Sequence, residues 1–92
     1  MRHIVYAYRM AIKMRLDKYL KVSRIIKRRT VANEVCDAKH VSVNGKTARA
    51  SLEIKPGDII EIQMGQSLTK YEVLSVNEYA KKEDADKMYK AL

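Results

Sequence analysis

The 92-residue sequence contains no Phe or Trp, one Cys, one Pro and three Gly residues. A single cysteine, Cys36, excludes an intramolecular disulfide framework and a cysteine-based metal site, and it suits a reducing cytoplasm. We expect Cys36 to be a small buried thiol. The two histidines, His3 and His40, are isolated, so no metal or other cofactor is expected. No apolar run approaches the roughly 18 residues of a membrane span, so we expect no membrane partner.

Positive charge is concentrated in residues 14–29, which hold seven Lys and Arg residues and a single acidic residue, Asp17. This stretch accounts for +6 of the formal net charge of +8. Such a cluster attracts polyanions, because each neutralised phosphate releases condensed counterions. The charge pattern therefore predicts an RNA-binding module within a chain that has room for one domain.

The first thirteen residues differ in pattern from the rest of the chain. Tyrosines and Arg9 interrupt any apolar region, so residues 1–13 are a poor match to a signal peptide. Because a self-contained pattern begins at Met14, we expect residues 1–13 to be a leader, either a tag or an upstream extension. The alternative is a genuine N-terminal helix, since apolar residues in this stretch recur at helical spacing.

Two short helices are predicted next. Leu16, Tyr19 and Leu20 recur at i, i+3 and i+4 and predict a helix over residues 15–22. The loop after it carries two isoleucines, Ile25 and Ile26, that we expect to plug it into the core.

The second helix is predicted over residues 31–38, with Thr30 as its N-cap. Val31, Val35 and Ala38 are expected to form its buried face. Lys39 comes directly after its end, where a cation suits the helix dipole.

A change to period-2 alternation at Val41 predicts a small antiparallel sheet. Asn44-Gly45 predicts a type I′ hairpin between residues 41–43 and 46–49, and Pro56-Gly57-Asp58 predicts a second turn. Further strands are expected over residues 60–64 and 68–76. The predicted fold class is α+β: two short N-terminal helices packed on a small twisted antiparallel sheet, plus a C-terminal helix. The predicted division is a leader (1–13), an RNA-binding domain (14–76) and a C-terminal helical tail (77–92).

Four motifs in this order resemble a known RNA-binding domain. They are Arg15-Leu-Asp-Lys-Tyr-Leu, the basic run that ends at Thr30, Val41-Ser-Val-Asn-Gly-Lys, and Lys55-Pro-Gly-Asp-Ile-Ile. Together they resemble the domain named after small-subunit ribosomal protein S4, also called the αL motif, over about residues 14–64. Because all four occur in order, the match is specific.

The resemblance implies a non-enzymatic, RNA-binding role. Small free-standing members of the family act on dissociated large ribosomal subunits, and the present chain is most similar to a branch that works in ribosome-associated quality control. By this resemblance its partners are rRNA of the large ribosomal subunit, peptidyl-tRNA, and RqcH, which adds a C-terminal alanine tail to stalled chains. We expect a cytoplasmic monomer.

The predicted RNA-binding residues are all cations. Arg15 and Arg29 rank first, because a guanidinium presents a planar fork of donors that suits phosphate and can stack on an unpaired base. Arg29 also lies beside a predicted helix N-terminus, which itself favours phosphate. The remaining candidates are Lys18, Lys21, Arg24, Lys27, Arg28, Lys46 and Arg49. The alternative is that these side chains only solvate the surface or pair with a carboxylate such as Asp17, whose expected role is structural.

Two other functions stay open on the sequence alone. One is a generic rRNA-binding or ribosome-assembly RNA chaperone with the same cations and no role in quality control. The other is a small RNA-modifying enzyme, which would need a nucleophile or an acid–base pair. Cys36 with His40 is the nearest approach to one, and we predict no catalytic residues.

Overall fold

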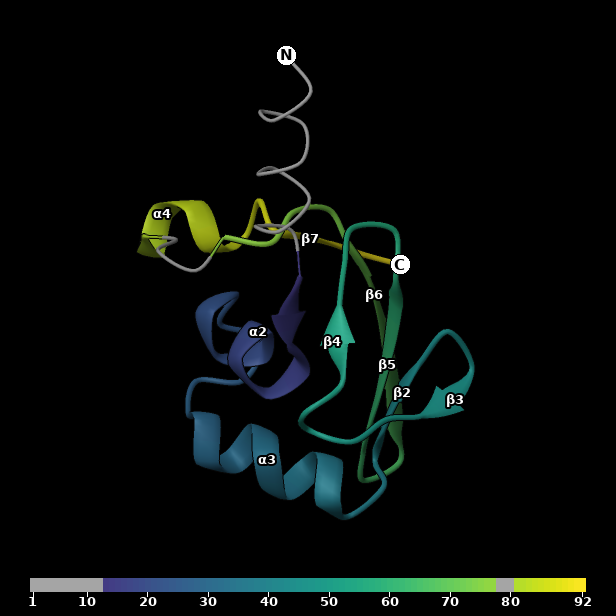
Figure 1. Cartoon of the computed structure of the whole chain (residues 1–92). Helices are drawn as coiled ribbons and strands as arrows, with labels where there is room; N and C mark the ends of the chain where they lie inside the picture. Colours follow the sequence, from purple (N-terminus) through teal and green to yellow (C-terminus); the bar gives the residue numbers. More distant parts are fainter. Residues whose placement is uncertain (1–12, 78–80) are drawn as a thin grey trace.

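The computed structural model describes residues 13–77 and 81–92, so the expected leader lies almost wholly outside the described residues (Figure 1). Two helices, α2 (Leu16–Val22) and α3 (Arg29–Asp37), lie on one side of a five-stranded antiparallel sheet with the strand order β3-β2-β5-β6-β7. The strands are β2 (Val41–Val43), β3 (Lys46–Thr47), β5 (Ile59–Met64), β6 (Ser67–Val73) and β7 (Tyr89–Ala91). The predicted α+β fold class is confirmed, and no described helix is long and apolar enough to cross a bilayer.

The core fills the space between the two helices and the sheet. Leu16, Tyr19 and Leu20 of α2 are completely buried, as their spacing predicts, and Ile26 closes the loop after the helix at 8% exposure. From the sheet, Ile60 and Ile62 point inward at alternate positions of β5. The two periodicities that the sequence shows, 3.6 and then 2, therefore meet in one hydrophobic core.

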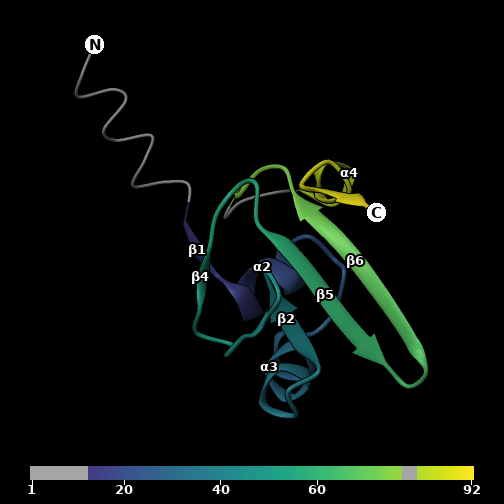
Figure 2. The same cartoon turned by 90° about the vertical axis from the view of Figure 1, so that its right-hand side faces the viewer.

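A second, two-stranded sheet was not predicted. It pairs β1 (Met14–Arg15) with β4 (Glu53–Ile54), in the register Met14↔Ile54 and Arg15↔Glu53 (Figure 2). The N–H of Leu16 then donates to the carbonyl of Leu52 at 2.8 Å. These bonds fix the loop after β3 along the start of α2. Strands of two residues carry no readable period, so the sequence contains no signal for them.

The second helix differs from the prediction in its start and in its buried face. It begins at Arg29 with Arg28 as N-cap, so the assignment of Thr30 as N-cap was wrong. Its buried residues are Ala32 and Cys36. Of the predicted face, Val35 is partly buried and packs against the core, whereas Val31 is 38% exposed and Ala38 is also exposed. Small side chains on the inner face let α3 approach α2 closely. Both sets of residues have helical spacing, so periodicity alone did not separate them.

Both predicted turns are confirmed. Asn44 and Gly45 have φ values of 53° and 85°, as a type I′ hairpin requires, and Gly57 has a φ of 96° in the turn before β5. The strand after the hairpin is shorter than expected, because β3 ends at Thr47 and the chain leaves the sheet at Ala48.

The tail combines a short helix with a strand. α4 (Lys82–Ala85) supplies the expected C-terminal helix but has only four residues, and the helix expected in the last residues was wrong, since β7 occupies Tyr89–Ala91. β7 pairs with the edge of β6, where the rings of Tyr71 and Tyr89 meet edge to face at 5.3 Å. The Tyr19 hydroxyl donates to the Met88 carbonyl at 2.7 Å, which ties this tail to α2.

Candidate nucleic-acid interface

One buried carboxylate holds the two cations ranked first. Asp17, in the first turn of α2, is 1% exposed. Arg15 donates to it from Nε and Nη2, both at 3.2 Å, and Nε of Arg29 lies 3.3 Å from its Oδ2. The Asn33 amide at 3.3 Å and the backbone N–H of Lys18 at 2.8 Å complete the set of donors. The structural role expected of Asp17 is thus that of a common acceptor for two chain segments.

The ionised state of Asp17 results from these contacts. Burial acts to raise the pKa of its carboxyl, but the hydrogen bonds from Arg15, Arg29, Asn33 and Lys18 outweigh burial and hold the pKa below its usual value. A single negative charge faces two guanidinium groups, so a positive charge remains. The Arg15 and Arg29 side chains are still 48% and 46% exposed. They pair with a carboxylate, as the alternative interpretation held, and they also present oriented donors to solvent.

The N-terminus of α3 adds backbone donors beside these side chains. The residues that lead into it, Lys27 and Arg28, are exposed, and Arg29 is its first helical residue. Of the side chains that the structure describes, none caps this nine-residue helix, and its first turn holds no acidic residue. The first N–H groups of a helix and its dipole favour an anion at this end.

The other candidate cations fall into two groups. Lys18 and Lys21 come after Arg15 on α2 at spacings of three, and Arg24 lies in the loop with a φ of 62°. We call residues 15–29 the cationic segment. Lys46 and Arg49 lie apart from it in sequence, on β3 and on the loop after β3.

A groove connects Arg49 with the cationic segment. It runs between α3 and residues 47–51, has a volume of about 520 Å³, and is lined by Arg15, Lys39 and Arg49 among others. The prediction missed Lys39, because its place after the helix explained it as a charge that suits the dipole. The sequence contains no signal for its place in the groove, because that place depends on how residues 47–51 run past the end of α3.

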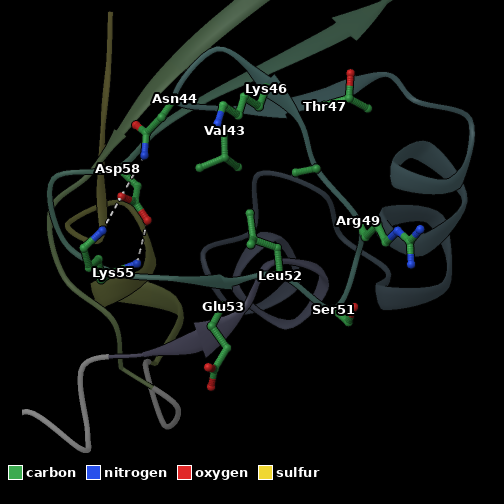
Figure 3. Close-up of a pocket in the computed structure, with 11 residues that line it drawn as sticks. Val43, Asn44, Lys46, Thr47, Arg49, Ser51, Leu52, Glu53, Lys55 and Asp58 are labelled. Atoms are coloured by element: carbon green, nitrogen blue, oxygen red, sulfur yellow. Dashed lines mark hydrogen bonds and ion pairs between the residues drawn. The ribbon is translucent and has the colours of Figure 1, made fainter.

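A second hollow, which we call the hairpin pocket, lies on the other side of the same loop (Figure 3). It has a volume of about 740 Å³ and is lined by residues between Val43 and Asp58. Arg49 lines both hollows, and Lys46 lines only this one. Four candidates are therefore connected in sequence along the surface. Arg29 and Arg15 share the Asp17 carboxylate, Arg15 and Arg49 line the groove, and Arg49 and Lys46 line the hairpin pocket.

Cys36 lines the groove, and its surroundings do not favour a nucleophile. The Cys36 thiol is buried, and burial together with the charges of Asp17 and Asp37 raises its pKa to about 11, which opposes thiolate formation. His40 contacts the Gln63 carbonyl at 3.1 Å. Within residues 13–77 and 81–92, no three His, Cys, Asp or Glu side chains are grouped to hold a metal ion. Basic side chains outnumber acidic ones around both hollows.

Two short helices packed on a small antiparallel sheet, with two guanidinium groups on one carboxylate, agree with the αL RNA-binding motif that the sequence resembles. Residues 14–60 match the S4 domain, and the chain belongs to this family.

Individual proteins of known name are similar to this chain as well. The chain is 51% identical over 79 residues to the RQC P-site tRNA stabilizing factor of Bacillus subtilis (strain 168), covering 86% of this chain and 92% of the relative. It is 53% identical over 79 residues to the factor of the same name from Streptococcus pneumoniae (strain ATCC BAA-255 / R6), covering 86% and 90%. The trimeric structure of Vibrio cholerae heat shock protein 15 shares the fold, with a TM-score of 0.78 at 23% identity over 87% of this chain and 82% of that one.

Proposed function

We propose that this protein is a non-enzymatic RNA-binding factor that holds tRNA and large-subunit rRNA on stalled, peptidyl-tRNA-bearing large ribosomal subunits. The observation that carries the proposal is the pair of half-exposed guanidinium groups oriented by buried Asp17 beside the N-terminus of α3. Rigid forks of donors next to the first N–H groups of a helix suit the phosphates of folded RNA. Its relatives are named for stabilising tRNA in the P site.

The proposed partners derive from this role. The cationic segment binds the RNA backbone through Arg15, Arg29, Lys18, Lys21, Arg24, Lys27 and Arg28, and Lys46 and Arg49 extend the contact. In this proposal the protein acts in the cytoplasm as a monomer and supports alanine tailing by RqcH. It contributes affinity and position, and the chemistry of tailing belongs to its partners.

Co-sedimentation with large subunits tests the proposal directly. Purified protein is mixed with large subunits that carry peptidyl-tRNA and with empty ones, and each mixture is separated on a sucrose gradient. We expect the protein to travel with the loaded subunits and to do so less after Arg15→Ala or Arg29→Ala. Lys70→Ala, a cation on the sheet, is the matched control. Protein that stays at the top of the gradient with both kinds of subunit would refute the proposal.

A generic rRNA-binding or assembly role is the second candidate. It is favoured by the nature of the contacts, because side chains that bind phosphate carry no sequence information by themselves. The shared fold with heat shock protein 15 is compatible with either role. Equal binding to loaded and empty subunits, with no effect on alanine tailing by RqcH, would support this second role over the first.

A further inference from the structure

The hairpin pocket has an apolar centre and a cationic rim. Figure 3 shows Val43 and Leu52 facing each other across it. Val43 is 6% exposed, whereas Leu52 is 41% exposed, although it lies in a loop otherwise rich in polar and charged residues. An apolar platform that is open to solvent in such a loop favours a ligand with a flat apolar face.

The charge of the rim is not cancelled by the protein itself. Lys55 is neutralised by Asp58, whose carboxylate it meets at 3.1 Å. Lys46 and Arg49 are both exposed, and neither forms an ion pair with any residue that the structure describes. Glu53 also lines the pocket, but the three cations of the lining still outnumber its two carboxylates. The pocket therefore combines an apolar surface with a net positive charge, a combination that suits a base attached to a phosphate.

The pocket is preformed. The Asn44 amide donates to Asp58 at 3.0 Å and accepts from the N–H of Ile59 at 2.9 Å, and Asp58 also accepts from the N–H of Lys55 at 2.9 Å. These bonds lock the hairpin to the turn before β5, so the two walls keep their separation. A ligand would then lose little free energy in ordering the site.

The pocket also continues the surface that carries the proposed function. The Leu52 carbonyl accepts from the N–H of Leu16, next to Arg15, and Arg49 lines both this pocket and the groove that contains Arg15. An RNA strand held at Arg15 therefore reaches the pocket by passing over Arg49.

We propose that the hairpin pocket receives one unpaired nucleotide of the bound RNA. Its base lies against Val43 and Leu52, and its phosphate contacts Arg49 and Lys46. This inference rests on the proposed RNA-binding function and adds to it a preference for a single-stranded segment next to a duplex. The pocket would thus read the shape of the RNA where the cationic segment reads only its charge.

Two RNA stem–loops with the same duplex test the inference, one blunt and one with a short single-stranded overhang that carries 2-aminopurine. We expect the wild-type protein to bind the overhang RNA about tenfold more tightly, with a change in 2-aminopurine fluorescence. Leu52→Glu should abolish this preference and leave binding of the blunt RNA nearly unchanged. Leu52→Phe, which offers a larger flat surface to the base, should increase it.

Leu68→Glu is the matched control, because Leu68 is 54% exposed on β6, away from the pocket. Thermal unfolding of both Glu variants shows whether each is folded. Equal binding of both RNAs by the wild type, or equal effects of Leu52→Glu and Leu68→Glu, would overturn the pocket and leave the proposed function standing. Binding of neither RNA would count against the proposed function itself. Displacement of 2-aminopurine from the pocket by a polyglutamate peptide as readily as by free single-stranded RNA would overturn the assignment to a nucleotide.

Discussion

The cationic segment and the outer face of the sheet are both rich in charge, and they arrange it in opposite ways. On the outer face, the cross-strand register places Glu61 opposite Lys70 and Glu72 opposite Lys90. The cationic segment contains seven cations and only one acidic residue, Asp17. Charges that are matched within the fold solvate a surface, whereas charges left in excess need an external anion. The difference teaches that the local balance of charge, more than its density, marks the binding surface.

The largest expected effect is on stability, and it tests whether the two carboxylates differ as the structure implies. Asp17→Ala leaves two guanidinium groups without their common acceptor, so it should lower the free energy of unfolding by about 2–3 kcal/mol. Glu61→Ala removes one member of a cross-strand pair at the surface and should cost about 0.5 kcal/mol. Urea denaturation measures both. A similar loss of unfolding free energy in the two variants would show that Asp17 and Glu61 do not differ in what they contribute to stability.

The next effect is on RNA affinity. Arg15→Ala and Arg29→Ala should each weaken binding to large-subunit RNA about tenfold, because each removes a charge-assisted contact with phosphate. Lys70→Ala should change the affinity by less than about twofold, because Lys70 lies on the sheet, outside the cationic segment, with Glu61 opposite it in the strand register. Filter binding gives the affinities, and circular dichroism confirms that each variant is folded. Equal losses for all three variants would show that position on the molecule is irrelevant.

A smaller effect is expected at low pH. In both Asp17 and Asp58 burial acts to raise the pKa, and hydrogen bonds from nearby donors outweigh it, so the folded pKa lies below the usual 3.8. The stability that these carboxylates contribute is therefore complete above pH 3.8 and is lost as the pH falls through their lowered pKa values. Acid titration of the unfolding free energy should show this decline, and Asp17→Ala should flatten it. A variant with the same acid profile as the wild type would contradict the role given to Asp17.

The smallest effect comes from adding charge at the wrong place. The double variant Glu61→Lys, Glu72→Lys makes the protein more cationic but leaves the cationic segment untouched. Its affinity for the same RNA at physiological salt should stay within about twofold of the wild type, because exposed charges beyond a Debye length are screened. An increase comparable to the loss caused by Arg29→Ala would mean that net charge alone drives binding.

Much of the fold could be predicted from local signals. The spacing of Leu16, Tyr19 and Leu20 identified the first helix, and Asn44-Gly45 identified the hairpin, because the backbone itself demands those residues. The inner face of α3 could be predicted only in part. Of the predicted residues, Val35 packs against the core, but Val31 and Ala38 are exposed and Ala32 and Cys36 are buried instead. Packing against α2 decided between them.

The tail and the site depended on contacts between distant residues. β7 is a strand because β6 offers it an edge, and no pattern within residues 77–92 contains that information. The cations that the sequence emphasised remain predictions as RNA contacts, and the contact of both Arg15 and Arg29 with Asp17 is visible only in three dimensions. The place of Lys39 in the groove and the existence of the hairpin pocket likewise depend on the path of the loop after β3, which the sequence does not show.

The salt dependence of RNA binding is the most direct test of the central claim that the cationic segment, whose seven cations outnumber its single carboxylate, contacts phosphates beside α3. We predict that log K for the wild-type protein falls linearly with log salt, and that Arg29→Ala makes the slope shallower by roughly 0.7–0.9, as the loss of one phosphate contact requires. Lys70→Ala should keep the wild-type slope. An Arg29→Ala protein that is folded and has the wild-type slope would contradict the account.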